Sequence, residues 1–182
     1  MKYRTGSLNG SKEGIALTET LPWSTYEQCQ ECFSPNDRRA ITCPCGPKPC
    51  DVMIIGQAPS FDLKLPPRRD TLKHSRTARL LRKRLEEIGQ NLDDFYFTNL
   101  IKCSSLTENK EGNQANCYEK LRKEIEEVMP KRIIVLGTKA KKVLKNKQDL
   151  VEKYRIQFIY HPAQRKLSHR SYCKQLEEAL KT

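Results

Sequence analysis

The sequence predicts an α/β domain in which helices cover both faces of a parallel sheet. Four short apolar runs have the composition of buried strands: DVMIIG (51–56), FYFTNLI (95–101), KRIIVLG (131–137) and YRIQFIYHPA (154–163). Helical patterns alternate with these runs, and such alternation is typical of parallel sheets. The 182 residues are enough for one domain with a full hydrophobic core but too few for two domains that each have one.

Each element of this prediction has a local justification. Residues 1–22 are rich in Gly, Ser and Thr and predict an irregular leader, with one domain over 23–182. A cysteine- and proline-rich stretch precedes the first strand, and the loop over 57–70 follows it. The segment 75–89, SRTARLLRKRLEEIG, places Leu80, Leu81, Leu85 and Ile88 at helical spacing and stops at a glycine.

The second half of the chain continues the alternation. Residues 113–130 predict a helix with Leu121, Ile125 and Val128 on one face and Pro130 at its end. A short helix is expected over 138–146 and a final helix over 169–181. In sheets of this kind the ligand lies beyond the carboxyl ends of the strands. Polar or unusual residues follow the strands there, in GQAPS, TNLIKC and YHPA, so the sequence predicts the site at that edge.

The charge distribution favours a polyanionic partner. The formal net charge is +12, and Lys and Arg are concentrated in residues 64–84 and 131–182. Two basic blocks on one small domain point to nucleic acid, with solvated lysine-rich helix faces as the alternative. The N-terminus lacks the apolar core of a signal peptide, so we expect a cytoplasmic protein.

Eight cysteines without a secretory signal indicate a metal site more than a disulfide framework. Cys29 and Cys32 form a CxxC pair, while Cys103 and Cys117 lie at a strand end and in the following helix. Four thiolates suit either zinc or an iron–sulfur cluster, and their spacing does not choose between the two. The three further cysteines of CPCGPKPC predict a rigid loop with spare thiols more than a second metal site.

Taken in order, the motifs CQEC, GQAPS, FYFTNLIKC, NCYEKLRKEI, RIIVLG and YHPA resemble the family 4 uracil-DNA glycosylases. The resemblance runs from about Trp23 to the C-terminal helix. It implies a three-layer α/β/α sandwich around a four-stranded parallel sheet. It also implies a [4Fe–4S] cluster. The implied ligands are Cys29, Cys32, Cys103 and Cys117.

The resemblance assigns roles at the strand ends. Asn99 matches the asparagine that reads the edge of a flipped base, a task that needs both a donor and an acceptor. His161 matches the histidine that donates a hydrogen bond to the departing base. Gln57 stands where the family has a water-activating glutamate, and Asp62 is a possible substitute for it. The remaining residues implied to bind the base are Gly56, Ala58, Pro59, Lys73 and His74.

Two further departures concern the walls of the base pocket and the loop after YHPA. The segment RRDTLKHS stands where the family carries a stacking phenylalanine. The position of an apolar wedge falls near Arg165, with Leu167 as the alternative. The residues expected to contact DNA are Ser60, Arg68, Arg69, Arg165, Lys166 and Leu167.

The sequence thus predicts a monomeric, monofunctional DNA glycosylase that leaves an abasic site. We expect its base to be other than uracil, for instance a modified cytosine in foreign DNA, which would make it a defence enzyme. One alternative is ordinary uracil excision in repair. Another is a non-catalytic iron–sulfur or zinc protein that binds nucleic acid. Gln57 favours this alternative, whereas the presence of both Asn99 and His161 argues against it.

Overall fold

A computed structural model of the chain describes residues 44–59, 72–102, 110–165 and 167–181. Over these ranges four strands form one sheet: β1 (Val52–Gly56), β2 (Tyr96–Asn99), β3 (Arg132–Leu136) and β4 (Arg155–Ile159). Their order is β2-β1-β3-β4, and every neighbouring pair is parallel. The predicted parallel sheet with helices is therefore confirmed.

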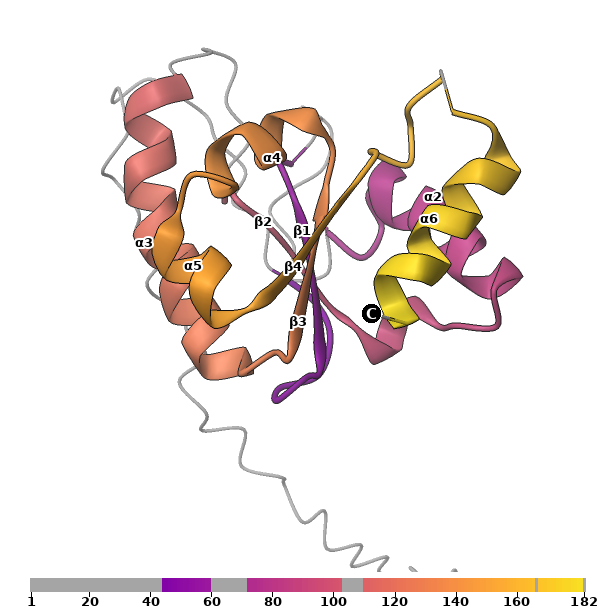
Figure 1. Cartoon of the computed structure of the whole chain (residues 1–182), viewed down its shortest axis with the longest axis horizontal. Coiled ribbons are helices and arrows are strands. Elements are labelled where there is room, and N and C mark those ends of the chain that lie inside the picture. The colour runs from indigo at the N-terminus through magenta and orange to yellow at the C-terminus, as the bar shows by residue number, and fades with distance from the viewer. Residues whose placement is uncertain (1–43, 60–71, 103–109, 166, 182) are drawn as a thin grey trace, which may run out of the picture.

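Helices lie on both sides of this sheet (Figure 1). On one side are α3 (Lys110–Val128), α4 (Thr138–Leu144) and α5 (Gln148–Lys153), and on the other are α2 (Arg76–Glu87) and α6 (His169–Lys181). Successive strand residues point to opposite faces, so each apolar strand supplies both layers. Met53 and Ile55 pack with the α3 side, whereas Ile54 packs with the α2 side.

The helical faces predicted from the sequence are buried, except that Leu80 of α2 and Ile88 at its end are half-buried. Leu121, Ile125 and Val128 of α3 are buried against the sheet, as are Leu81 and Leu85 of α2. Ser75 begins α2 by accepting a hydrogen bond at its Oγ from the Ala78 N–H, at 3.1 Å. Side-chain caps of this kind satisfy one of the free amides of a first helical turn.

Two short elements were not predicted from the sequence. The 3₁₀ helix η1 (Leu92–Asp94) precedes β2, and α5 follows α4. The six residues of α5 have no side-chain cap at their start and bury only Leu150 among their side chains. Such a segment lacks both the capping signature and the repeated apolar spacing by which a helix is recognised.

The outer edge of β2 is covered by the segment before β1. Cys45 and Phe97 exchange two backbone hydrogen bonds, of 2.9 and 2.7 Å, in an antiparallel bridge. The next residue is Gly46, at a φ of 119°, and a Cβ there would lie 2.1 Å from the Phe95 carbonyl oxygen. Glycine therefore lets this segment approach β2 closely, which protects an otherwise open sheet edge.

The predicted boundary between leader and domain, at residues 22 and 23, lies outside the described residues and stays a prediction. None of the helices in the described ranges is long and apolar enough to span a membrane.

Candidate active site

The polar residues after the strands lie at one edge of the sheet. Because all four strands are parallel, Gly56, Asn99 and the residues after Leu136 and Ile159 share the carboxyl edge. Backbone hydrogen bonds continue beyond the strands at this edge, from Leu100 N–H to Gly56 O at 2.9 Å and from Ile101 N–H to Gln57 O at 2.8 Å. These bonds hold the GQAPS loop start against the end of β2.

Asn99 is the buried polar side chain at the centre of this edge. It lies directly across from Gly56 in the sheet, and it is only 5% exposed. Its Nδ2 is buried and has no hydrogen-bond partner among the residues that the structure describes. Leaving an amide donor unpaired costs about 1–3 kcal/mol, so its retention here suggests that a bound molecule completes the bond.

Gly56 provides the space that Asn99 occupies. A Cβ built at Gly56 would lie 2.3 Å from Asn99 Oδ1 and 3.5 Å from its Cγ. Real Cβ atoms do not approach an oxygen so closely. The Asn99 side chain is short and buried, so its Oδ1 and Cγ cannot easily move away. The pair therefore depends on the absence of a side chain at Gly56.

We expect Gly56→Ala to displace the Asn99 amide while keeping the fold. The backbone at Gly56 does not lie in the left-handed region, so alanine costs little there beyond the contact itself. Binding of a target base to the variant should weaken by about tenfold or more, the scale of one lost hydrogen bond in a buried site. Far-UV circular dichroism and single-turnover kinetics together check this. Wild-type kinetics in a folded variant would contradict the role given to this contact.

His161 follows β4 in a tight turn, in which the Gln164 N–H donates to the His161 carbonyl at 2.8 Å. Within that turn the Ala163 N–H donates to His161 Nδ1 at 3.2 Å. Since Nδ1 accepts, the proton of the neutral ring resides on Nε2. Burial lowers the pKa of His161 below its ordinary value, which favours this neutral form.

Two residues from other elements set the position of this ring. Thr77, in the first turn of α2, places its Oγ1 3.3 Å from His161 Nε2. Gly137, between β3 and α4, has a φ of 88°, and a Cβ there would lie 3.2 Å from the His161 Cβ. The imidazole is thus held between α2 and the end of β3, with its Nε2–H available to a hydroxyl or to a ligand.

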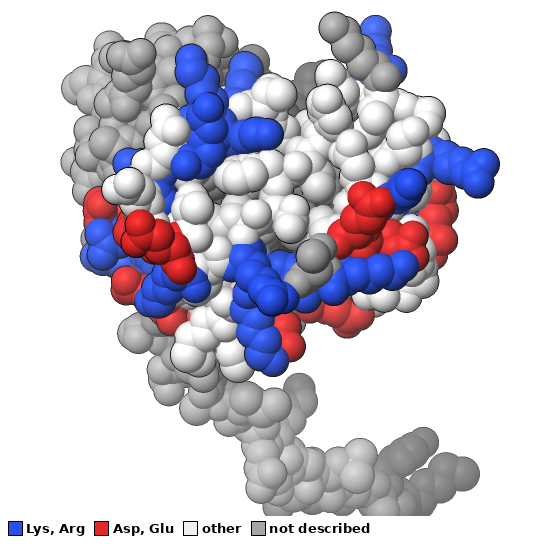
Figure 2. Space-filling view, in the orientation of Figure 1, with Lys and Arg blue, Asp and Glu red and all other residues white. Residues whose placement is uncertain are grey.

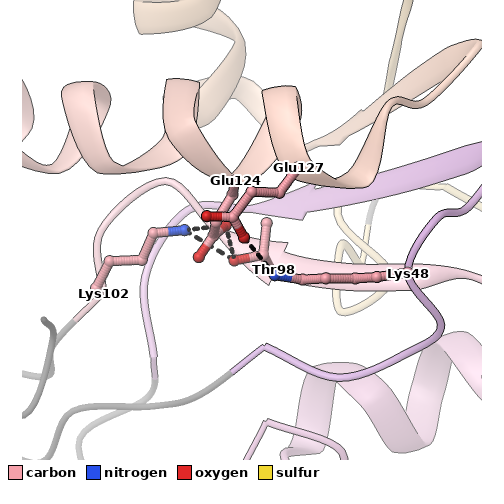
Figure 3. A network of polar contacts seen from close by, with 5 residues as sticks. All are labelled: Lys48, Thr98, Lys102, Glu124 and Glu127. Atoms are coloured by element: carbon pink, nitrogen blue, oxygen red, sulfur yellow. Dashed lines mark hydrogen bonds and ion pairs between the residues drawn. The ribbon is translucent and has the colours of Figure 1, made fainter. Parts of the chain in front are cut away.

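A buried ion pair fastens the end of β2 to α3 (Figure 3). Lys102 Nζ lies 2.7 Å from Glu124 Oε2 and 2.8 Å from Thr98 Oγ1, and the Thr98 hydroxyl donates to the same Glu124 oxygen at 2.9 Å. All three residues are at most 4% exposed. Burial lowers the pKa of Lys102, and the charge and hydrogen bond of Glu124 oppose that shift.

Such a network contributes little net stability, because removing two charges from water costs about as much as their attraction returns. Its consequence is geometric. Thr98 and Lys102 flank Asn99 on the same strand end, and both are held by one carboxylate of α3. The network therefore restrains the segment that carries Asn99.

The other predicted base and DNA contacts differ in their surroundings where they are described. Lys73 pairs with Asp93 at 3.1 Å, and His74 is exposed. Arg165 is exposed after the His161 turn, whereas Leu167 is half-buried against the core between α2 and α6. Ser60, Asp62, Arg68, Arg69 and Lys166 lie outside the described residues. Beside the site, Gln57 and Pro59 are half-buried and Ala58 is exposed.

Of the four predicted cluster ligands, Cys117 is described, and it is buried in α3. It acts electrostatically on Lys102, so a thiolate there would lie in the field of a buried ammonium group, which suits an anionic metal–thiolate centre. Cys117, the ligand of this set that the structure describes, therefore fits such a group. Cys29, Cys32 and Cys103 lie outside the described residues.

The cysteines of CPCGPKPC occupy structural positions where they are described. Cys50 is buried, and its S–H lies 3.2 Å from the Val52 carbonyl and 3.4 Å from that of Asp94. Burial raises the pKa of the Cys45 thiol to about 11 despite the nearby Lys73, so this thiol keeps its proton at neutral pH. Cys43 lies outside the described residues.

Basic side chains lie next to this edge on α4. That helix begins directly after β3, and its Lys139, Lys141 and Lys142 are all exposed. In Figure 2 blue side chains gather over the position of α4 near the top of the view. The sequence showed that residues 131–182 are basic, but it did not show that α4 lies beside the candidate site.

Several residues of the site were missed from the sequence. Thr77, Gly137 and Glu124 come from elements that no motif joins to the strand ends. Thr98 and Lys102 could have been noticed, because they stand on either side of Asn99 in TNLIK. Their partner Glu124 could not, because it lies on α3, 22 residues after Lys102.

A parallel α/β sheet with a buried, unpaired amide and an oriented imidazole at its carboxyl edge defines an enzyme-like site for a small polar ligand. The chain belongs to the uracil DNA glycosylase superfamily, whose family model matches residues 43–182. A comparison with curated proteins gives no significant match. The superfamily predicted from the sequence is thus confirmed. Membership indicates that the protein is a DNA glycosylase.

Proposed function

We propose that this protein is a monofunctional DNA glycosylase of the iron–sulfur type, which flips a base other than unmodified uracil and hydrolyses its N-glycosidic bond. The observation that carries this proposal is the buried Asn99 amide with an unpaired Nδ2 at the carboxyl edge. An amide there supplies a donor and an acceptor to the edge of an extruded base, as base-flipping enzymes require.

The sheet order sets the spacing of the two proposed recognition groups. Asn99 ends β2 and His161 follows β4, and these outer strands are three strand spacings apart, or about 14 Å. In our proposal the flat ring of the base lies between these two side chains. Asn99 would bind one edge of the base, and the Nε2–H of His161 would face an oxygen on it.

In the hydrolysis, a water oxygen forms a bond to C1′ as the bond from C1′ to the base nitrogen breaks. The base leaves with the electron pair of that bond, and the negative charge develops on its exocyclic carbonyl oxygen. The neutral His161 donates its Nε2–H hydrogen bond there, in a geometry set in advance by the Ala163 amide. The water gives its proton to solvent or to a carboxylate, for which Asp62 is our candidate.

Gln57 supports a substrate other than uracil. Its amide can orient a water but cannot accept the water's proton at neutral pH. Lys73, near the position of the family's stacking phenylalanine, is paired with Asp93 at the surface and does not present a flat ring to a base. The segment RRDTLKHS has no phenylalanine, and a pocket walled by it would offer room and polar contacts to a substituted base, such as a glycosylated cytosine.

A lyase step is disfavoured by the state of Lys102. This lysine is buried, and Glu124 and Thr98 engage its ammonium group. A nucleophilic lysine must be neutral and must reach C1′ of the substrate. Hydrolysis that leaves an intact abasic strand is therefore the expected outcome.

The proposed cluster is a [4Fe–4S] centre held by Cys29, Cys32, Cys103 and Cys117. When bound, it would supply a structural cross-link among the segments that carry these cysteines. Cys117 contributes from α3, the helix whose Glu124 also holds Thr98 and Lys102. The cluster and the ion-pair network would thus act on the same strand end.

Cys117→Ser and Cys103→Ser should each abolish stoichiometric iron and lower the folded fraction, because metal binding and folding are coupled in such sites. Cys45→Ser is the matched control and should keep its iron, since Cys45 lies in the bridge to β2 and is not among the proposed ligands. Iron and sulfide analysis with the absorbance near ~400 nm provides the measurement. Iron retained in Cys117→Ser but lost from Cys45→Ser would refute the ligand assignment.

The proposed function is tested by single-turnover excision from one oligonucleotide sequence carrying uracil, hypoxanthine, 5-hydroxymethylcytosine or its glucosylated form. Alkali then reveals abasic sites. We expect excision of a modified cytosine and slow or no release of uracil. Efficient uracil release alone would establish the ordinary repair function instead, and binding without any abasic product would establish the non-catalytic one.

A further inference from the structure

A second group of metal-ligating side chains lies away from the candidate active site, between α2 and α6. Glu87 is the last residue of α2, and His169 and Cys173 belong to α6. One ligand atom from each, a carboxylate oxygen, an imidazole nitrogen and a thiol sulfur, lies within 4.8 Å of the other two. His169 Nε2 contacts Glu87 Oε2, and Cys173 Sγ lies 3.3 Å from the same oxygen.

The two helices bring these atoms together for a regular reason. His169 and Cys173 are four residues apart, so their side chains lie one above the other on one face of α6. The packing of α2 against α6 through Leu81, Leu85 and Leu176 then places the end of α2 beside that face. The cluster is therefore built on two helices with a shared core and not on loops.

We propose that Glu87, His169 and Cys173 form a zinc site that joins α2 to α6. A thiolate, an imidazole and a carboxylate are the ligand types of Zn²⁺, which takes four ligands in a tetrahedron, and water would be the fourth here. A carboxylate and a thiolate together neutralise the dication. The site is independent of the proposed glycosylase function and of the proposed iron–sulfur ligands.

The neighbouring charges set the conditions for binding. Arg84 Nη1 lies 2.7 Å from His169 Nε2, so the guanidinium must withdraw when a metal takes that nitrogen. Zinc binding to Cys173 displaces the proton of its thiol. Removing Arg84 should therefore increase zinc affinity.

The site is too far from His161 to take part in base release. Thr77, which contacts His161, and Glu87 are ten residues apart on α2, or about 15 Å along the helix axis. Zinc would instead fix α6 to α2. Both helices pack on the sheet face to which Phe97 contributes, and Asn99 lies on the same face because it is two residues further along the strand. Its expected effect is on stability.

The test uses the purified full-length protein, stripped of loosely bound metal, with ZnCl₂ as the probe. Competition with a chromophoric zinc indicator gives stoichiometry and affinity for the wild type, Cys173→Ser, His169→Ala and Glu87→Gln, with Cys45→Ser as the matched control. We expect each of the three cluster variants to lose one zinc equivalent and the control to keep it. Arg84→Gln should bind zinc about tenfold more tightly, because one opposing cation is removed.

Two spectroscopic and thermal readouts complete the test. Co²⁺ added in place of zinc should give visible d–d bands with a thiolate charge-transfer band, present in Cys45→Ser and absent in Cys173→Ser. Zinc at a hundredfold excess over its dissociation constant should raise the melting temperature by roughly 5–10 °C. Equal zinc binding by the wild type and the three cluster variants would overturn the proposal, as would a wild type that binds none.

Discussion

Replacing His161 by alanine should lower the single-turnover rate of base release by roughly two to three orders of magnitude, the range for removing one preorganised donor to a developing anion. The donor is preorganised here because the Ala163 N–H occupies Nδ1 and so directs the ring proton to Nε2. DNA affinity should change little, since the charge of the site is unaltered when the ring is neutral. Rapid-quench kinetics and fluorescence anisotropy provide the two measurements.

His161→Gln serves as a graded comparison, because its amide retains a donor but lacks the ring geometry. It should lie between the wild type and His161→Ala. Burial lowers the pKa of His161, so its imidazole should take up a proton at a lower pH than a free histidine does, which nitrogen NMR can observe directly. A His161→Ala variant with the wild-type rate would remove this residue from the mechanism.

Glu124→Gln should lower the free energy of unfolding by about 3–5 kcal/mol, the usual cost of breaking a buried ion pair from one side. The reason is that the variant leaves the Lys102 ammonium group buried without its counter-charge, while Thr98 loses its charged acceptor. Urea denaturation followed by circular dichroism measures the change. The same variant should lower catalytic activity, because Asn99 lies between Thr98 and Lys102.

Two controls separate the buried charge from the loss of any carboxylate on α3. Glu127→Gln removes the nearby pair with Lys48, whose 2.7 Å contact is much more exposed, and should cost less than about 1 kcal/mol. The double variant Lys102→Met with Glu124→Leu should recover part of the stability lost in Glu124→Gln, since no charge remains buried. Equal losses in Glu124→Gln and Glu127→Gln would contradict this account.

The strands and most of the helices could be predicted from the sequence, because each depends on a local pattern. VMIIG and RIIVL are near-continuous apolar runs of the kind that a sheet buried on both faces requires. Leu121, Ile125 and Val128 repeat at helical spacing and are all buried. The position of Asn99, Gln57 and His161 at strand ends followed from the same runs, and the parallel connection placed them at one edge.

The tertiary structure alone decided what surrounds these residues. Gly56 meets Asn99 across two strands that are 43 positions apart, Thr77 meets His161 from a different layer, and Glu124 meets Lys102 from a helix. No local pattern encodes such contacts, because they form only when separate elements pack together. A polar group that becomes buried then needs a hydrogen-bond partner from whichever element lies beside it. The same holds for Glu87 beside His169 and Cys173: the spacing on α6 is visible in the sequence, but the packing of α2 supplies the third ligand.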